Sequence, residues 1–229
     1  LRLLEGLLPI LGQVEGLEWI RVSYLQPAEI RPDLVRIIAQ TAGVAPYFDL
    51  SFQHASNNVL RRMKRFGDPE SFLGLLAAGR AFNPEMGART NVIVGFPGET
   101  DAEFEDTMRI VEQVGYAQCF SFKYSARPGT PAATMEGQVP AAVMDERLQR
   151  LQAALNASQL AFNQASVGKR CTVLVERRGR HEGQWLGKSP WLQSVHFIGD
   201  AAIGDLVEVE LVEAGPNSLA ARLVGAEHG

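Results

Sequence analysis

Residues 90–107 read TNVIVGFPGETDAEFEDT and hold the clearest structural signal in the chain. The first seven of these residues are rich in β-branched and aromatic side chains, which predicts a strand. Thr100 and Glu103 stand three residues apart, which is the spacing of a capping box, and Gly115 is placed to end the helix that follows. This stretch therefore predicts a strand, a glycine-containing turn and a helix, in that order.

The same alternation extends outward on both sides. Residues 19–25 (WIRVSYL), 47–52 (YFDLSF) and 119–125 (CFSFKYS) are predicted strands, and the runs between them are predicted helices, with Ser56 and Asp68 as N-caps. Strands separated by helices of this length pair in parallel through right-handed crossovers. Four such strands are too few to close an eight-stranded barrel, so the predicted fold class is α/β with a partial parallel (β/α) barrel.

The pattern of predicted secondary structure changes after a long helix predicted over residues 140–164, which Gly168 ends. Short strand-like runs follow, namely TVLVE, SVHFIG and DLVEVELVEA, divided by Gly, Pro and Asn. This pattern predicts a small antiparallel barrel. We place a domain boundary near Ser166, which gives a (β/α) domain over residues 1–165 and a barrel domain over residues 166–229.

Composition and charge exclude several classes of protein. The 229 residues are 46% hydrophobic and 21% charged, and the net charge of −4 provides no global basic field for nucleic acid, so any RNA site must be local. The apolar run over residues 3–11 is interrupted by Glu5, Gly6 and Pro9, and predicts neither a membrane span nor a signal peptide. We therefore expect a cytoplasmic protein without a membrane partner.

Metal binding is not predicted. Cys119 and Cys171 show no CxxC spacing and are too few for a zinc or iron–sulfur site, and the four histidines are scattered along the chain. Sparse thiols of this kind suit a reducing compartment.

Ligands of parallel sheets bind beyond the carboxyl ends of the strands. The GFPGET turn at residues 95–100 allows close backbone approach beside a helix N-terminus, although it also fits an ordinary tight turn. The QHAS run at residues 53–56 adds polar groups, but a lone His54 is more often a hydrogen-bonded loop residue than a ligand. The KYSARPGTPA loop at residues 123–132 carries a cation, a phenol and Arg127, or is an ordinary surface loop.

Three strings in this order, YFDLSFQHASNNVLRRMKR, NVIVGFPGETDAEFEDT and FSFKYSARPGTPAATM, resemble the radical S-adenosylmethionine methylthiotransferases. That family adds a methylthio group to a tRNA adenosine or to an aspartate of a ribosomal protein. The resemblance implies that S-adenosyl-L-methionine binds at the strand ends; Glu99 also fits a role in capping its own helix or orienting the turn. The residues implied to face this cofactor are Gln53, Ser56, Asn91, Gly95, Glu99 and Tyr124. Arg127 and Thr130 are implied to lie toward the sulfur-acceptor substrate.

The cluster motif of that family, CxxxCxxC, does not occur in this sequence. In the family, three thiolates hold a [4Fe-4S] cluster that cleaves S-adenosyl-L-methionine reductively. The domain with the sulfur-donating cluster and the first two barrel strands are missing as well. We therefore expect Leu1 to be a fragment boundary, expect the fragment alone to be inactive, and assign no catalytic residue.

The resemblance is divided over the substrate. Residues 19–103 are more similar in sequence to the branch that acts on ribosomal protein S12, and the residues from Thr107 onward are more similar to the tRNA branch. We favour tRNA, because the later half carries the loop and the barrel that should touch the substrate. In the intact parent, expected to be a monomer, a 5′-deoxyadenosyl radical would abstract hydrogen from C2 of N6-isopentenyladenosine at position 37, in the anticodon stem-loop. The alternative outside the enzymes is a non-catalytic RNA-binding protein.

The C-terminal tail resembles a TRAM domain, an OB-like barrel that binds RNA. Its basic residues gather near its start, and two tryptophans nearby are candidates for stacking on bases. The alternative is a solvated hairpin whose aromatic residues are core. The residues predicted to contact RNA are Lys169, Arg170, Arg177, Arg178, Arg180, Lys188, Trp185 and Trp191.

Overall fold

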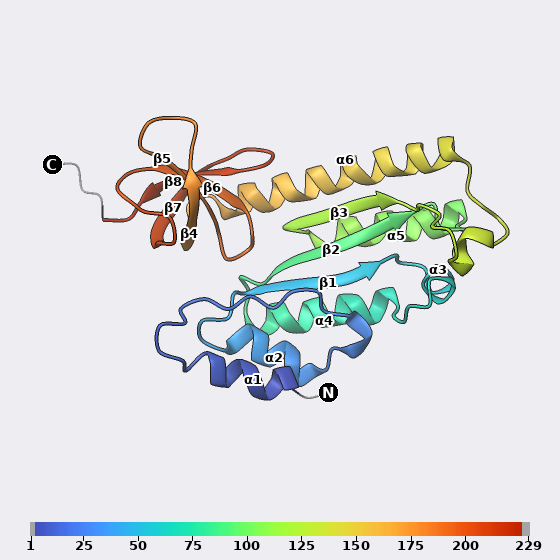
Figure 1. The fold of residues 1–229 in the computed structure, drawn as a ribbon, viewed down its shortest axis with the longest axis horizontal. Helices are drawn as coiled ribbons and strands as arrows, with labels where there is room; N and C mark the ends of the chain where they lie inside the picture. The colour runs from blue at the N-terminus through green and yellow to red at the C-terminus, as the bar shows by residue number, and fades with distance from the viewer. Residues whose placement is uncertain (1–2, 226–229) are drawn as a thin grey trace. The chain divides into compact units, whose positions relative to one another are not determined.

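The computed structural model describes residues 3–225, and its contacts divide the chain into two units between Leu155 and Asn156. Both units are drawn in Figure 1. The N-terminal unit contains α1 (Leu3–Leu11), η1 (Pro27–Glu29), α2 (Pro32–Gln40), β1 (Tyr47–Gln53), α3 (Asn57–Arg62), α4 (Pro69–Phe82), β2 (Gly87–Val94), α5 (Asp101–Val114), β3 (Gln118–Lys123), η2 (Pro131–Thr134) and the first part of α6 (Ala141–Ser166). The C-terminal unit contains the rest of α6, β4 (Arg170–Arg178), β5 (Gln184–Lys188), β6 (Ser194–Ile198), β7 (Leu206–Ala214) and β8 (Leu219–Leu223).

The sheet of the N-terminal unit has the order β1-β2-β3, with both pairings parallel. Its neighbours in space are neighbours in sequence, joined by helical crossovers, as the alternation of strand and helix patterns predicted. Side chains at alternate positions face the helices: Phe48 approaches Gly79 of α4, and Phe52 stacks on Phe72 at 3.9 Å between ring centroids. The predicted partial parallel fold is confirmed.

The opposite face of this sheet is exposed to solvent at β3. Arg89, Phe120 and Phe122 lie on it, and the two phenylalanines are 41% and 53% exposed. Arg89 pairs with Asp49 at 2.6 Å and lies 4.5 Å from the ring of Phe120. This face of the sheet therefore carries exposed aromatic rings on β3 beside a buried ion pair between β1 and β2.

Residues 19–25 do not form the regular strand that the sequence predicted. They touch the sheet through two isolated parallel bridges, Ile20 with Val44 and Leu25 with Leu50. Between the bridges the N–H of Tyr47, which alternation would direct toward residues 19–25, bonds to the carbonyl of Ala45 instead. The partner segment therefore lacks a donor that a continuous ladder needs.

The helix termini follow the predicted capping residues. Ser56 accepts a hydrogen bond from the N–H of Val59 at the start of α3, and Asp68 accepts one from Ser71 at the start of α4. Thr100 and Glu103 form both bonds of the capping box of α5, which ends at a left-handed Gly115. Each of these signals acts within three or four residues, which explains why the sequence alone was sufficient.

The C-terminal unit is a closed barrel of order β4-β5-β6-β8-β7, in which β6 and β8 pair in parallel and the other neighbours are antiparallel. The predicted small barrel is confirmed, and β5 and β8 are strands that the sequence analysis did not identify. Alternate residues fill the interior, where the buried side chains are Cys171, Val173, Val175, Trp185, Val195, Phe197, Val209, Leu211 and Leu219. Gln193, before β6, donates to Asn163 (2.8 Å) and Ser166 (3.2 Å) of α6.

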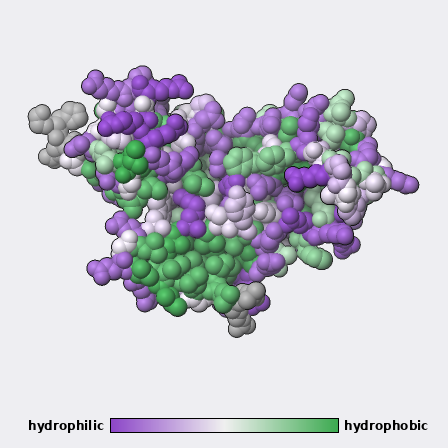
Figure 2. Space-filling model, in the orientation of Figure 1, coloured by the Kyte–Doolittle hydropathy of each residue, from purple (hydrophilic) through white to green (hydrophobic). Residues whose placement is uncertain are grey.

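An apolar patch covers the outer side of α1, visible as a green area in Figure 2. Leu3 is 69% exposed and Ile10 63%, while Leu8 on the inner side is buried. No helix among residues 3–225 is both long enough and apolar enough to cross a membrane.

Candidate functional site

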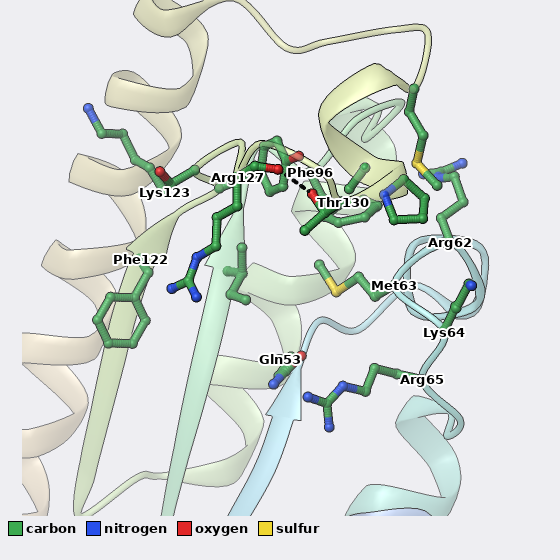
Figure 3. Close-up of a pocket in the computed structure, with 16 residues that line it drawn as sticks. Gln53, Arg62, Met63, Lys64, Arg65, Phe96, Phe122, Lys123, Arg127 and Thr130 are labelled. Carbon is green, nitrogen blue, oxygen red and sulfur yellow. Dashed lines mark hydrogen bonds between the residues drawn. The ribbon is translucent and has the colours of Figure 1, made fainter.

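A cavity of about 650 Å³ opens at the carboxyl ends of the parallel strands, within the size range of small-molecule sites. β1 contributes Gln53, β2 contributes Ile93 and β3 contributes Phe122. The other lining residues come from the end of α3 and the turn after it, from the turn after β2, and from the end of β3 and the segment that follows it through η2 (Figure 3): Arg62, Met63, Lys64, Arg65, Phe96, Lys123, Tyr124, Ser125, Arg127, Thr130, Pro131, Ala132 and Met135.

The turn after β2 is organised by Glu99. Its carboxylate accepts hydrogen bonds from the backbone N–H of Gly95 (2.6 Å) and of Phe96 (3.2 Å). Gly95 has φ 76°, and a Cβ there would lie 2.3 Å from Cγ of Met144 in α6, so this position requires glycine. The Glu99 side chain is fully buried, and neither Gly95 nor Glu99 lines the cavity. Glu99 thus orients the turn, which is the role the sequence offered besides a ligand.

Arg147 of α6 balances the buried charge of Glu99. Its guanidinium donates to Oε1 of Glu99 at 2.9 Å and to the exposed carboxylate of Asp101 at 2.6 Å. His54 lies on the other side, with Nε2 3.5 Å from Glu99, while its Nδ1 accepts from the N–H of Ser56. The sequence analysis missed Arg147 because its partner lies 48 residues away in the chain.

Ser56 belongs to a network beside the cavity and does not line it. Its hydroxyl donates to Oε1 of Glu103 at 2.9 Å, and Oε2 of Glu103 accepts from Thr100 and Arg62. Burial alone would raise the pKa of Glu103, but the hydrogen bonds from Thr100 and Ser56 and the charge of Arg62 outweigh it and lower that pKa below its ordinary value. Glu103 is therefore an ionised anchor between α3 and α5.

Gln53 and Tyr124 are the two predicted cofactor residues that line the cavity. Gln53 ends β1 with φ 67°, a conformation that costs energy for a residue other than glycine and often marks functional positions. The ring of Tyr124 meets that of Phe96 edge to face at 5.1 Å, and its buried hydroxyl has no hydrogen-bond partner within residues 3–225. Asn91 lies two residues before Ile93 on the same face of β2, half-buried and outside the lining.

The two predicted substrate residues, Arg127 and Thr130, both line the cavity. The hydroxyl of Thr130 donates to the carbonyl of Arg127 at 2.8 Å, which fixes the turn between them (Figure 3). The cations of the turn after α3 were not predicted as site residues. The signal was present in the LRRMKR run at residues 60–65, which begins within α3, the first helix after β1.

The predicted RNA-binding cations spread along the barrel surface. Arg170 begins β4 and Arg177 lies near its end, seven residues later, so at about 3.3 Å per residue they stand roughly 23 Å apart. Arg178 lies over the ring of Trp185 at 4.6 Å, and Lys188 donates to Ser194 at 2.8 Å. The remaining two, Lys169 and Arg180, flank β4. Such an array can follow several phosphates of a strand but forms no single compact patch.

The two tryptophans require a correction. Trp185 is 6% exposed and Trp191 4%, and Nε1 of Trp185 donates to the carbonyl of Gly199 at 3.0 Å. Neither ring presents a face on which a base could stack, because both pack in the barrel unit. The expectation that they bind RNA by stacking was wrong, and the alternative with core aromatics holds for these two residues.

The residues present do not fit an iron–sulfur cluster. Cys119 lies in β3 and Cys171 in β4, and burial raises the pKa of each thiol to about 12, which opposes the thiolate form that ligates iron. Among residues 3–225 no group of three or more His, Cys, Asp or Glu side chains could hold a metal ion.

Comparison with known families identifies the class of both parts. Residues 3–111 match the Radical SAM superfamily, and residues 164–224 match the TRAM domain. The chain therefore contains a segment similar to the Radical SAM superfamily, here called the radical SAM segment, and a segment similar to the TRAM domain. Coproporphyrinogen III oxidase from Escherichia coli, a radical SAM enzyme, has the same type of fold with a TM-score of 0.52 at 18% identity, over 76% of this chain and 47% of that one.

Curated relatives make the similarity more particular. The tRNA-2-methylthio-N(6)-dimethylallyladenosine synthase of Novosphingobium aromaticivorans is 59% identical over 96% of this chain, and that of Erythrobacter litoralis is 57% identical over 96%. The synthase of Zymomonas mobilis is 44% identical over 94% of the chain. The chain spans about half the length of these relatives, 50%, 50% and 48% respectively.

Proposed function

We propose that this chain provides the cofactor-positioning and tRNA-binding part of a methylthiotransferase that modifies C2 of N6-isopentenyladenosine (dimethylallyladenosine) at position 37 of tRNA. The observation that carries the proposal is the identity of 59% with a tRNA-2-methylthio-N(6)-dimethylallyladenosine synthase over 96% of the chain. The aligned 220 residues include both the radical SAM segment and the TRAM domain.

The cavity supports S-adenosyl-L-methionine as the cofactor. Ile93 and Phe96 supply apolar surface for an adenine ring, and the unpartnered hydroxyl of Tyr124 and the amide of Gln53 supply polar contacts. In this proposal Glu99 holds the turn that carries Phe96 beside the nucleoside and does not itself contact the cofactor. When bound to a cluster, S-adenosyl-L-methionine supplies a radical; the [4Fe-4S] ligands are not among this chain's residues, and we assign to the chain binding and positioning alone.

The barrel is proposed to bind the anticodon stem-loop through its cations. The support is the TRAM match over residues 164–224 together with exposed guanidinium groups on an acidic protein. A protein that acts on tRNA in this way would work in the cytoplasm, and we propose a monomer. The residues assigned to phosphate contacts are Lys169, Arg170, Arg177, Arg178, Arg180 and Lys188.

A chimera tests the proposal. Residues 1–229 would replace the matching half of the Novosphingobium aromaticivorans relative, and the tRNA of a host without methylthiotransferase activity would be digested and its nucleosides analysed by mass spectrometry. We expect the 2-methylthio nucleoside to appear. A chimera that folds and holds its iron but leaves tRNA unmodified refutes the proposal, and a methylthio group on an aspartate of ribosomal protein S12 would assign the chain to that rival activity. The matched control is the unaltered relative.

A further inference from the structure

The turn after α3 forms a cationic wall of the cavity. Arg62, Lys64 and Arg65 lie on it, and Lys123 and Arg127 come from the loop on the opposite side (Figure 3). Among the described residues that line the cavity, none is acidic. Five cations around one cavity stand out in a chain whose net charge is −4, so the charge of the cavity bears on which ligand it binds.

Part of this positive charge is neutralised locally and part is not. Arg62 pairs with Glu103 at 3.3 Å, and Lys123 pairs with Asp145. Arg65 bonds to the neutral side chain of Gln26 at 2.8 Å, so its charge remains. Within residues 3–225 neither Lys64 nor Arg127 has an ion pair with an acidic side chain. Three uncompensated cations thus face the cavity from two sides.

This charge does not suit S-adenosyl-L-methionine by itself. The cofactor carries a sulfonium and an ammonium against a single carboxylate, so its net charge is positive and the uncompensated cations repel it as a whole. A nucleic acid backbone has the opposite charge and releases counterions when cations neutralise its phosphates. The uncompensated cations of the cavity therefore fit phosphodiester groups, while its apolar lining residues, Ile93 and Phe96, fit a nucleoside.

The backbone at Lys64 provides a second, independent observation. The N–H of Arg65 bonds to the carbonyl of Leu60 and the N–H of Lys64 to that of Arg61, which is the Schellman arrangement at the end of a helix. Lys64 occupies its left-handed position with φ 56°, where glycine is the residue of lowest cost. A lysine held in this conformation on a cavity wall points to a function that glycine cannot supply.

We propose that Lys64 and Arg65 bind backbone phosphates of the RNA whose nucleotide enters the cavity, from the side opposite Arg127. This inference rests on the proposed function, and it adds a phosphate-binding surface in the radical SAM segment that is separate from the cations of the TRAM barrel. RNA would then be held by two independent sets of cations, one in each unit.

The test measures binding of a fluorescein-labelled anticodon stem-loop RNA to the full 229-residue chain by anisotropy at several salt concentrations. In the double variant Lys64→Gly/Arg65→Gln the log–log salt slope should become shallower by about 1.4, since each single-strand phosphate contact contributes about 0.7. At 0.15 M salt this slope corresponds to a loss of about fourfold in affinity per contact. The control Arg36→Gln removes an exposed cation of α2 outside the cavity and should leave binding unchanged.

Stability separates this role from a structural one. Lys64→Gly alone relieves the left-handed strain, so its melting temperature should equal or exceed that of the parent while its RNA affinity falls. A double variant that binds the stem-loop with the parent's affinity and salt slope overturns the inference, and so does an unaltered chain that binds no stem-loop RNA. Nucleoside analysis of the chimera judges the proposed function separately, so the two can fail independently.

Discussion

Removal of one partner of the buried pair Arg147 and Glu99 should strongly destabilise the N-terminal unit. The side chains are 4% and 0% exposed, and removing Arg147 leaves the carboxylate of Glu99 buried without its counterion. Breaking such a pair costs about 3 to 5 kcal/mol, so Arg147→Met should destabilise the unit by about that amount. At about 2 to 4 °C per kcal/mol for a chain of this size, the melting temperature should fall by roughly 6 to 20 °C.

Arg150 provides a matched control on the same helix. It also pairs with a glutamate, Glu105 at 2.6 Å, and lies over the ring of Phe104 at 5.0 Å, where Arg147 lies at 5.6 Å. Its side chain is 44% exposed and that of Glu105 48%, so Arg150→Met should cost about 0 to 1 kcal/mol.

Calorimetry of the full chain measures both variants, with the transition of the C-terminal unit as an internal reference. Amide exchange adds a local readout, because Gly95 and Phe96 donate to Glu99 and should lose protection in Arg147→Met. The double variant Arg147→Met/Glu99→Gln should cost less than the sum of the single variants, because the two side chains interact directly. Equal effects of Arg147→Met and Arg150→Met would refute the reasoning, since burial is the difference that it uses.

Three further predictions concern the turn, the anchor and the barrel. Gly95→Ala combines a left-handed φ with a clash against Met144 and should lower the free energy of unfolding in urea by about 2 to 4 kcal/mol. Gly115→Ala also has a left-handed φ, but its Cβ would meet nothing within 4 Å, so it should cost about 1 kcal/mol. Similar losses in the two variants would contradict the packing argument. The pKa of Glu103 is lowered from 4.5, so the stability that its carboxylate provides is present above pH 4.5 and is lost as the pH falls through its folded pKa. The difference in free energy of unfolding between the parent and Glu103→Gln should therefore shrink on acidification. A difference independent of pH would contradict this. A triple alanine variant of the barrel should reduce the salt slope of RNA binding by about 2 and weaken different RNAs alike, and an unchanged slope would remove the barrel from the proposed interface. The residues replaced are Arg177, Arg178 and Arg180.

The helix α6 contributes residues to both units. Near its start, α6 holds the turn after β2 through Met144 and Arg147, and near its end Asn163 and Ser166 bond to Gln193 of the barrel unit. α6 thus supports the turn beside the cavity in the N-terminal unit, and its last part packs against the barrel within the C-terminal unit.

The sequence by itself determined the features that depend on neighbouring residues. The strands β1, β2 and β3 follow from short apolar runs, and the helix starts from Ser56 and Thr100, because a cap bonds to an N–H within three residues of itself. The parallel pairing followed from strand and helix spacing. Gln53, Tyr124 and Arg127 were found by the same local rule, since each stands where a strand pattern ends.

The tertiary structure alone decided what depends on distant partners. Residues 19–25 have a strand-like pattern, yet their pairing is interrupted because the N–H of Tyr47 in the partner segment bonds to Ala45. Trp185 has the same sequence context whether it is exposed or enclosed, and the closed barrel buried it. The partnership of Glu99 with Arg147 and the gathering of Lys64, Arg65 and Arg127 around one cavity join residues tens of positions apart. Burial and long-range charge pairing are properties of the folded arrangement, and no local pattern encodes them.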